Sequence, residues 1–228
     1  MRLSAFIAAL LMMFALAPAQ AVPKDWNRVV AATPAGGYLI GNPAAPVKVV
    51  EYFSLTCPHC RHFFETGLAP LRGNYIAKGK VSLELRNFVL NGPDLSASIL
   101  MTCGSPALAV HLYDAVYADQ EKLFAGAYSL KQDAQDRIQA APLEAKPGVF
   151  AHEAGIDAWF AAHGLPPKQA AACLADPKRQ QRLIDLRAEA IEKQNVQGTP
   201  TFVVNGTAVS GTGWEDLEPA IKTALGGG

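Results

Sequence analysis

The sequence predicts an α/β fold in which an all-helical block is inserted between the strands of one sheet. Runs rich in β-branched and aromatic residues at 47–53 and 201–209, and an alternation of apolar and polar residues at 81–86, are typical of strands. Residues from about 94 to 182 show helical periodicity instead. With 228 residues, of which 50% are apolar and 18% charged, the chain is long enough for one domain that carries such an insertion.

The first 21 residues have the features of a cleavable signal peptide. Met1-Arg2 is a short basic start, residues 4–16 form an apolar run, and Ala19-Gln20-Ala21 is a small-residue cleavage site. A retained membrane anchor is the alternative, but the apolar run is shorter than a membrane-spanning helix requires. We therefore expect an exported protein in the periplasm, a compartment in which disulfides persist.

The charge of the chain argues against a nucleic-acid partner. Removal of the signal peptide takes Arg2 from the 20 basic residues and nothing from the 20 acidic ones, so 19 and 20 remain and the net charge is −1. A nearly neutral chain without a basic cluster has little attraction for a phosphate backbone.

The segment before the central strand is expected to lie as an arm against the domain. Glycine and proline punctuate residues 22–46 and leave one short strand candidate at Tyr38-Leu39-Ile40. The apolar run at 47–53 that follows predicts a central strand, and a helix is expected directly after it, from residue 57 on.

Two local signals are expected to interrupt the elements that follow. Gly67 and Pro70 should kink or break the helix that begins near residue 57. Residues 81–86 alternate in polarity as a half-buried strand does, and Asn91-Gly92-Pro93 is expected to end that strand.

Helix start and stop signals divide the helical block. Ser105-Pro106 and Asp176-Pro177 each combine an N-cap residue with a first-turn proline. Between them, apolar residues from Phe150 to Ala161 predict one helix that Gly164 closes.

The C-terminal part returns to strands and ends in a helix. Asn205-Gly206 between two β-branched runs predicts a hairpin. Thr212 and Glu215 have the spacing of a capping box for the last helix. We expect four segments in the chain: a signal peptide (1–21), the first part of the sheet domain (22–93), the helical insertion (94–182) and the second part of the sheet domain (183–228).

The motif that carries chemistry is Cys57-Pro58-His59-Cys60, placed where a strand becomes a helix. The N–H groups and positive dipole end of a first helical turn favour a thiolate at Cys57, Pro58 suits that turn, and His59 can add a donor or a positive charge. Cys57 is thus the expected nucleophile and Cys60 the resolving thiol. A zinc site would need two further ligands that the spacing does not supply, and no metal or cofactor motif is present.

The order of these elements resembles the DsbA family, which has a thioredoxin-like fold with an inserted all-helical domain. The specific matches are Val47-Lys48-Val49-Val50-Glu51-Tyr52-Phe53, the Cys-Pro-His-Cys motif and Val196-Gln197-Gly198-Thr199-Pro200-Thr201-Phe202. The resemblance implies that Pro200 is a cis-proline packed against the motif. It also implies that Glu51 is a buried proton acceptor for the resolving thiol. Thr199 departs from the valine of the best-known strong oxidases, and several isomerases and reductases carry threonine there.

Cys103 and Cys173 both fall in the helical block. Some members of the family carry a second, non-catalytic disulfide, and an even cysteine count in an oxidising compartment favours a bond between these two. Two buried thiols packed as small apolar groups are the alternative.

These observations together favour a periplasmic thiol:disulfide oxidoreductase that donates its Cys57–Cys60 disulfide to unfolded or partly folded exported proteins. The resemblance implies reoxidation by a quinone-linked membrane thiol oxidase, and we expect a monomer. One alternative is a disulfide isomerase or reductase that is kept reduced. Another is a module that binds a soft metal through the two cysteines or holds unfolded peptides.

Overall fold

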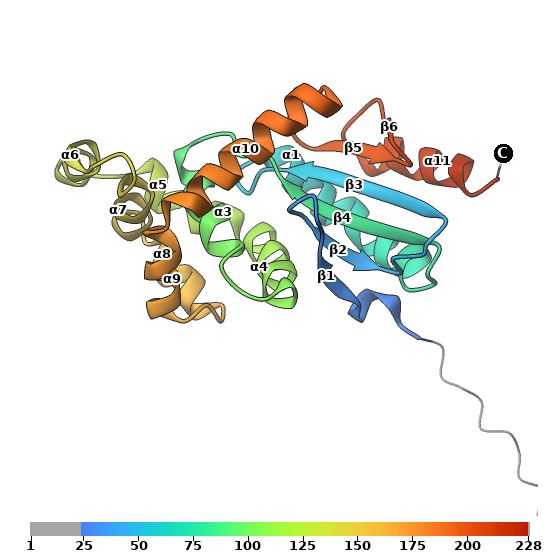
Figure 1. The fold of residues 1–228 in the computed structure, drawn as a ribbon, viewed down its shortest axis with the longest axis horizontal. Coiled ribbons are helices and arrows are strands. Elements are labelled where there is room, and N and C mark those ends of the chain that lie inside the picture. Colours follow the sequence, from blue (N-terminus) through green and yellow to red (C-terminus); the bar gives the residue numbers. More distant parts are fainter. Residues whose placement is uncertain (1–23, 228) are drawn as a thin grey trace, which may run out of the picture.

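The computed structural model describes residues 24–227, and the expected signal peptide lies outside the described residues. The chain forms one six-stranded mixed sheet and a cluster of helices beside it (Figure 1). The strands are β1 (Val30–Ala32), β2 (Tyr38–Gly41), β3 (Val47–Phe53), β4 (Val81–Asn87), β5 (Thr201–Val204) and β6 (Thr207–Ala208). The short 3-10 helix η1 (Trp26–Arg28) precedes them.

The sheet has the order β1-β2-β4-β3-β5-β6, with β3 parallel to β4 and antiparallel to β5. β3 therefore lies inside the sheet, which explains its nearly continuous apolar sequence. Only Lys48 on this strand is exposed. The register pairs Glu51 with Leu85 on one side and with Phe202 on the other, so this carboxyl group lies in the middle of the sheet. The α/β fold expected from the sequence is confirmed, and β1 is an additional strand that the sequence reading did not identify.

The helix that follows β3 is not broken at Gly67 or Pro70. It continues from Pro58 to Ile76 through α1 (Pro58–Phe63), the π-helical segment η2 (Phe64–Leu68), α2 (Ala69–Leu71) and the π-helical segment η3 (Arg72–Ile76). The wide π turns absorb the proline, which has no N–H to donate. A side chain at Gly67 would meet the Phe63 ring at 2.6 Å, so glycine serves close packing here rather than a break.

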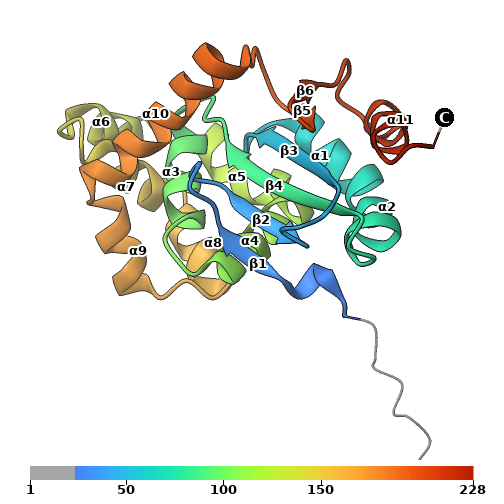
Figure 2. The same ribbon diagram turned by 45° about the vertical axis from the view of Figure 1, so that its right-hand side comes forward.

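The inserted block consists of eight helices in the described residues (Figure 2). They are α3 (Gly92–Met101), α4 (Pro106–Ala118), α5 (Gln120–Tyr128), α6 (Gln132–Ala140), α7 (Lys146–Glu153), α8 (Ile156–Ala162), α9 (Pro167–Leu174) and α10 (Pro177–Gln194).

Two expectations for this block were wrong. Asn91 does not end a strand; β4 ends at Asn87, and the Asn91 side chain caps α3 by accepting from Asp94 N at 2.9 Å. The single helix expected from Phe150 to Ala161 is divided into α7 and α8 because Gly155 adopts a positive φ of 72° between them.

The helix starts at Ser105 and Asp176 are confirmed, since each side chain accepts a hydrogen bond from a first-turn N–H. The hairpin at Asn205-Gly206 is also present, with φ of 48° and 88°. The last helix, α11 (Trp214–Ala224), begins later than expected. The capping box expected between Thr212 and Glu215 is not formed; instead Gly213 is the N-cap residue, and its N–H donates to the Asp216 carboxylate at 3.1 Å.

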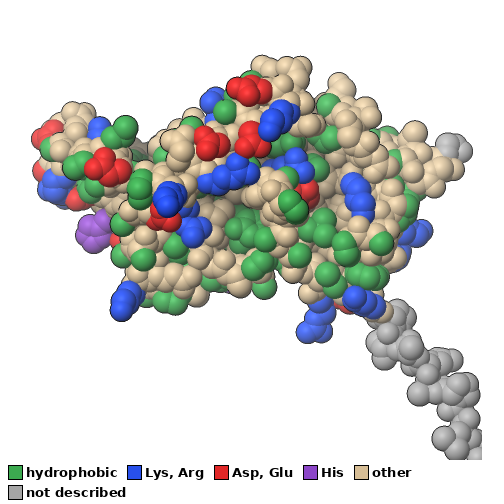
Figure 3. All heavy atoms as spheres, in the orientation of Figure 1, with side chains coloured by type: hydrophobic (Ala, Val, Ile, Leu, Met, Phe, Trp, Pro, Cys, Tyr) green, Lys and Arg blue, Asp and Glu red, His purple; other side chains and the backbone are tan. Residues whose placement is uncertain are grey.

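α10 joins the helical block to the sheet (Figures 1 and 2). Near its start Arg179 donates to the Thr102 carbonyl at 2.9 Å, and near its end Ala190 packs with Tyr52 and Val203 of the sheet. The boundary expected at residue 182 falls inside this helix, and the division of the chain into domains stays a prediction. The exposed side of α10 carries side chains of both charges (Figure 3).

Cys103, after the end of α3, and Cys173 of α9 are joined by a disulfide in which the sulfurs are 1.99 Å apart. Both residues are buried. Within residues 24–227 we find no helix with both the length and the apolar character that crossing a bilayer requires.

Candidate active site: two cysteines at the start of a helix

The two cysteines of the motif lie one helical turn apart but differ in access to solvent. β3 ends at Phe53, a short loop follows, and Cys57 is the N-cap residue of α1 with Pro58 in the first turn. Cys57 is 6% exposed and Cys60 is 0% exposed. Both are free thiols in this structure, so it corresponds to the reduced form. The geometry makes Cys57 the sulfur that an outside reactant reaches first.

The environment separates the acidities of the two thiols. Hydrogen bonding from the Cys60 side chain is the largest influence that lowers the pKa of Cys57, to about 5, and the Thr199 hydroxyl and the N–H groups of Cys60 and His59 act in the same direction. Burial raises the pKa of Cys60 well above its ordinary value, and the neighbouring Cys57 raises it further. At neutral pH the dithiol therefore holds one negative charge, on Cys57.

Thr199 and Pro200 lie beside Cys57. The Thr199–Pro200 peptide bond is cis, as the family resemblance implied. Cys57 Sγ lies 3.2 Å from the Thr199 carbonyl oxygen, to which the protonated thiol donates. The buried Thr199 hydroxyl has no other partner among the described residues, which leaves it free to face the sulfur.

The side chains of Pro58 and His59 are exposed at the start of α1. His59 contributes its backbone N–H to the Cys57 thiolate. A role for its imidazole stays a prediction.

Glu51 is fully buried in the middle of the sheet, near enough to Cys57 for the charge of that sulfur to act on it. Its Oε2 accepts a hydrogen bond from the Tyr113 hydroxyl at 2.7 Å, while its Oε1 has no partner among the described residues. Burial raises the pKa of Glu51 to about 8, against the opposing effect of Tyr113, and the charge on Cys57 raises it as well. The carboxyl group can therefore gain and lose a proton near neutral pH.

A second buried acid, Asp94 of α3, holds the loop before Cys57 and was missed in the sequence. Its carboxylate accepts from Ser54 Oγ at 2.6 Å, from Leu55 N at 3.0 Å and from Leu90 N at 2.8 Å. Burial raises the pKa of Asp94 to about 6 even though these donors oppose the shift. An acid near a helix start is a common capping feature, so no separate signal in the sequence points to this role.

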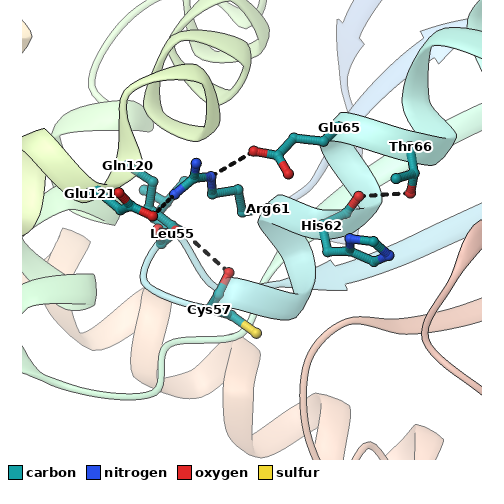
Figure 4. A network of polar contacts seen from close by, with 8 residues as sticks. All are labelled: Leu55, Cys57, Arg61, His62, Glu65, Thr66, Gln120 and Glu121. Carbon is teal, nitrogen blue, oxygen red and sulfur yellow. Dashed lines mark hydrogen bonds and ion pairs between the residues drawn. The ribbon is translucent and has the colours of Figure 1, made fainter.

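The helical block also contacts this loop. The Tyr117 hydroxyl donates to the Ser54 carbonyl at 2.8 Å, and Gln120 Nε2 donates to the carbonyls of Leu55 at 2.7 Å and Cys57 at 3.1 Å. Figure 4 shows that Gln120 holds the Cys57 backbone while the sulfur points away from it.

Arg61 ties α1 to the helical block at the surface. Its guanidinium donates to Glu65 at 2.8 Å and is also paired with Glu121 of α5 (Figure 4). These contacts lie beside the cysteines and hold the helix that presents them. Within residues 24–227 we find no group of three or more His, Cys, Asp or Glu side chains placed to hold a metal ion.

The sequence matches the thioredoxin family over residues 33–223. A protein of Rickettsia prowazekii that carries the name protein-disulfide oxidoreductase is 26% identical over 187 residues, which are 82% of this chain and 61% of that protein. A protein of the same name from Rickettsia felis is 29% identical over 188 residues, which are 82% of this chain and 59% of that protein. The chain thus spans about three fifths of the length of these relatives.

Solved structures of disulfide oxidoreductases and isomerases are similar to this chain in fold. The crystal structure of a protein-disulfide isomerase from Novosphingobium aromaticivorans superposes with a TM-score of 0.76 at 29% identity, covering 82% of this chain and 96% of that one. Alpha-DsbA1 of Wolbachia pipientis has the same fold, with a TM-score of 0.63 at 21% identity over 85% of this chain and 92% of that one.

Proposed function

The chain belongs to the thioredoxin family, among its DsbA-type protein-disulfide oxidoreductases, and on this premise we propose that it oxidises the thiols of unfolded exported proteins in the periplasm. The observation that carries the proposal is the contrast between the two cysteines of the motif. Cys57 is reachable and has a pKa of about 5, whereas Cys60 is buried with a raised pKa.

The reaction begins with the Cys57–Cys60 disulfide. A substrate thiolate attacks Cys57 Sγ, the bond between the two enzyme sulfurs breaks, and Cys60 leaves as a thiolate that takes up a proton because its pKa is high. A second substrate thiolate then attacks the substrate sulfur of the mixed disulfide, and Cys57 leaves as a thiolate. The substrate gains one disulfide, and the enzyme gains the two electrons and one proton.

The stability of the Cys57 thiolate favours the oxidising direction. A low thiol pKa makes Cys57 a good leaving group and stabilises the reduced enzyme, which raises the reduction potential of the pair. Reoxidation by a quinone-linked membrane thiol oxidase and action as a monomer belong to the same proposal and rest on the family resemblance.

A disulfide isomerase or reductase is the second candidate. Thr199 before the cis-proline and the name of the structure from Novosphingobium aromaticivorans favour it. Such an enzyme would be kept reduced, and its Cys57 thiolate would attack substrate disulfides.

The reduction potential decides between the two. Equilibration of the purified protein with glutathione buffers, followed by quantification of free Cys57 and Cys60, should give a potential nearer to about −120 mV than to the value of about −270 mV of thioredoxin. The oxidised protein should also introduce disulfides into a reduced, unfolded test protein. A potential close to that of thioredoxin would contradict the oxidase proposal and support the reductase.

A further inference from the structure

We propose that Tyr113 of the helical block is a positioning residue of the redox site: its hydroxyl holds one oxygen of the Glu51 carboxyl group and leaves the other to carry the proton exchanged with Cys60. This inference rests on the proposed function, because it concerns a proton that moves only when the Cys57–Cys60 disulfide opens and closes. It assigns a part in the chemistry to a residue of the insertion.

The hydrogen bond between Tyr113 and Glu51 identifies which oxygen of the Glu51 carboxyl group is held. The Tyr113 hydroxyl lies 2.7 Å from Glu51 Oε2, and both side chains are fully buried. The Tyr113 ring is fixed by edge-on contacts with Phe53 at 5.1 Å and with Tyr117 at 4.8 Å between ring centroids. The hydroxyl therefore has little freedom to find another partner.

The hydrogen bond can persist in both states of the carboxyl group only if the mobile proton is on Oε1. A phenol can donate both to a carboxylate oxygen, where the hydrogen bond is stronger, and to the carbonyl oxygen of a protonated carboxyl group. Glu51 Oε1 is buried and has no partner among the described residues. Burial and the Glu51 charge raise the pKa of Tyr113 well above its ordinary value, so Tyr113 stays a donor throughout the working range.

The surroundings of Glu51 offer no other neutral donor of this kind among the described residues. The titratable and charged groups that act on Glu51 and Tyr113 are Cys57, the N-cap residue of α1, Cys60 of α1, Arg72 of η3, and Asp114 of α4. Arg72 is already engaged by Asp114 through two contacts of 2.6 and 2.9 Å. Tyr113 is therefore the group that sets the orientation of the Glu51 carboxyl.

The step itself is a proton transfer that accompanies sulfur exchange. When the disulfide opens, the Cys60 sulfur leaves with the electron pair and takes the proton from Oε1 of Glu51. When the enzyme is reoxidised, Cys60 returns that proton to the Glu51 carboxylate and its sulfur attacks the Cys57 sulfur of the mixed disulfide, which releases the oxidant's thiolate. Tyr113 keeps its hydrogen bond to Glu51 Oε2 both when the disulfide opens and when it forms again.

The test uses Tyr113→Phe, which removes the hydroxyl and keeps the ring. The rate at which Cys60 closes a mixed disulfide of Cys57 with glutathione is measured against pH, and the Glu51 carboxyl is titrated by carbon-13 NMR. Loss of a donor to a carboxylate disfavours its charged form. The midpoint of the pH dependence of closure and the midpoint of the Glu51 titration should therefore both move up by about one pH unit. Closure at neutral pH should slow up to about tenfold.

Tyr75→Phe is the matched control. The Tyr75 hydroxyl also donates to a glutamate, Glu218 of α11, at 2.9 Å, but this pair lies outside the redox site. Its loss should leave both midpoints in place. In a Glu51→Gln background the midpoint that belongs to Glu51 should disappear, leaving only the pH dependence of the Cys60 thiol, and Tyr113→Phe should have no further effect. If Tyr113→Phe does not fold, 3,5-difluorotyrosine at position 113 strengthens the donor and should move the midpoints down.

Unchanged midpoints in Tyr113→Phe, or an equal shift in Tyr75→Phe, would overturn the inference. Failure of the proposed function would look different, because the wild-type protein itself would then not exchange disulfides with glutathione or with a reduced protein.

Discussion

Cys57 and Cys60 differ in exposure and in acidity, and this contrast assigns their roles. We predict that Cys57→Ser abolishes disulfide exchange, whereas Cys60→Ser accumulates mixed disulfides with substrates because the resolving thiol is missing. In the reduced wild-type protein, iodoacetamide should modify Cys57 first, with a midpoint near the pKa of about 5. Mass spectrometry of the modified peptides measures both outcomes. Faster modification of Cys60 would reverse the assignment.

The low pKa of Cys57 also links stability to pH. The folded protein has a pKa of about 5 where the unfolded chain has the ordinary value of 9.0, so the reduced protein gains stability as pH rises between these values. The slope for one proton is about 1.4 kcal/mol per pH unit, and the gain is lost again as pH falls through 5. The oxidised protein has no Cys57 proton to lose.

Urea unfolding of both redox forms checks this linkage. The stability of the reduced form relative to the oxidised form should increase from pH 5 to 9. Glu51, with a pKa raised from 4.5 to about 8, acts in the opposite sense, and its stabilising contribution is lost as pH rises to 8. Because Glu51 is present in both forms, the main part of its contribution cancels in the difference, and Cys57 is the largest group that titrates in only one of the two forms below pH 9. A difference that does not vary with pH would show that Cys57 is not a stabilised thiolate.

Local signals in the sequence were sufficient for part of the site. The position of Cys57 at a strand-to-helix junction follows from the residues around it, and Glu51 and Pro200 were obtained from the family resemblance. Tyr113 could not be found in this way, because its partner Glu51 lies 62 positions away and only the packing of α4 on the sheet brings them together. The pattern of a tyrosine on an apolar helix face predicts an ordinary core residue.

At the level of elements, end caps were more predictable than helix interiors. Ser105 and Asp176 mark helix starts through a side chain and an N–H two or three residues apart, which is a purely local interaction. Gly67 was misread because its role depends on Phe63 and Trp214, which pack closely over it. The last helix starts at Trp214, one residue later than the Thr212–Glu215 spacing suggested, since a glycine N–H can be capped as well as a threonine one.

Gln120, at the start of α5, makes the contact between elements that we expect to stabilise most the loop between β3 and α1. Gln120→Ala leaves the buried carbonyls of Leu55 and Cys57 without their donor, which should lower the free energy of unfolding by about 2 kcal/mol. Chemical denaturation of the reduced protein measures this loss.

Gln135→Ala is the control for that substitution. It removes a hydrogen bond of 2.9 Å to the Leu130 carbonyl at an exposed position of α6, where water replaces the lost donor. It should change stability by less than about 0.5 kcal/mol. Equal effects of the two substitutions would mean that Gln120 does not hold the loop.

At the scale of the whole molecule, the Cys103–Cys173 disulfide closes a large part of the helical block. The two cysteines are 70 positions apart, and in the chain-entropy model a loop of this length contributes about 4 kcal/mol to stability. Replacement of both by Ala should lower the thermal unfolding midpoint by several degrees. Disulfide exchange at Cys57 should be retained, because neither sulfur contacts the motif. Loss of exchange in a folded double variant would show that this bond serves the reaction.

The bridging position of α10 limits how the protein can open around a substrate. Eighteen residues of uninterrupted helix form a strut about 27 Å long, anchored on the helical block at Arg179 and on the sheet at Ala190. These two contacts tie the helical block and the sheet to the same helix. Because a continuous helix resists bending, α10 couples the position of the helical block to that of the sheet that carries Cys57.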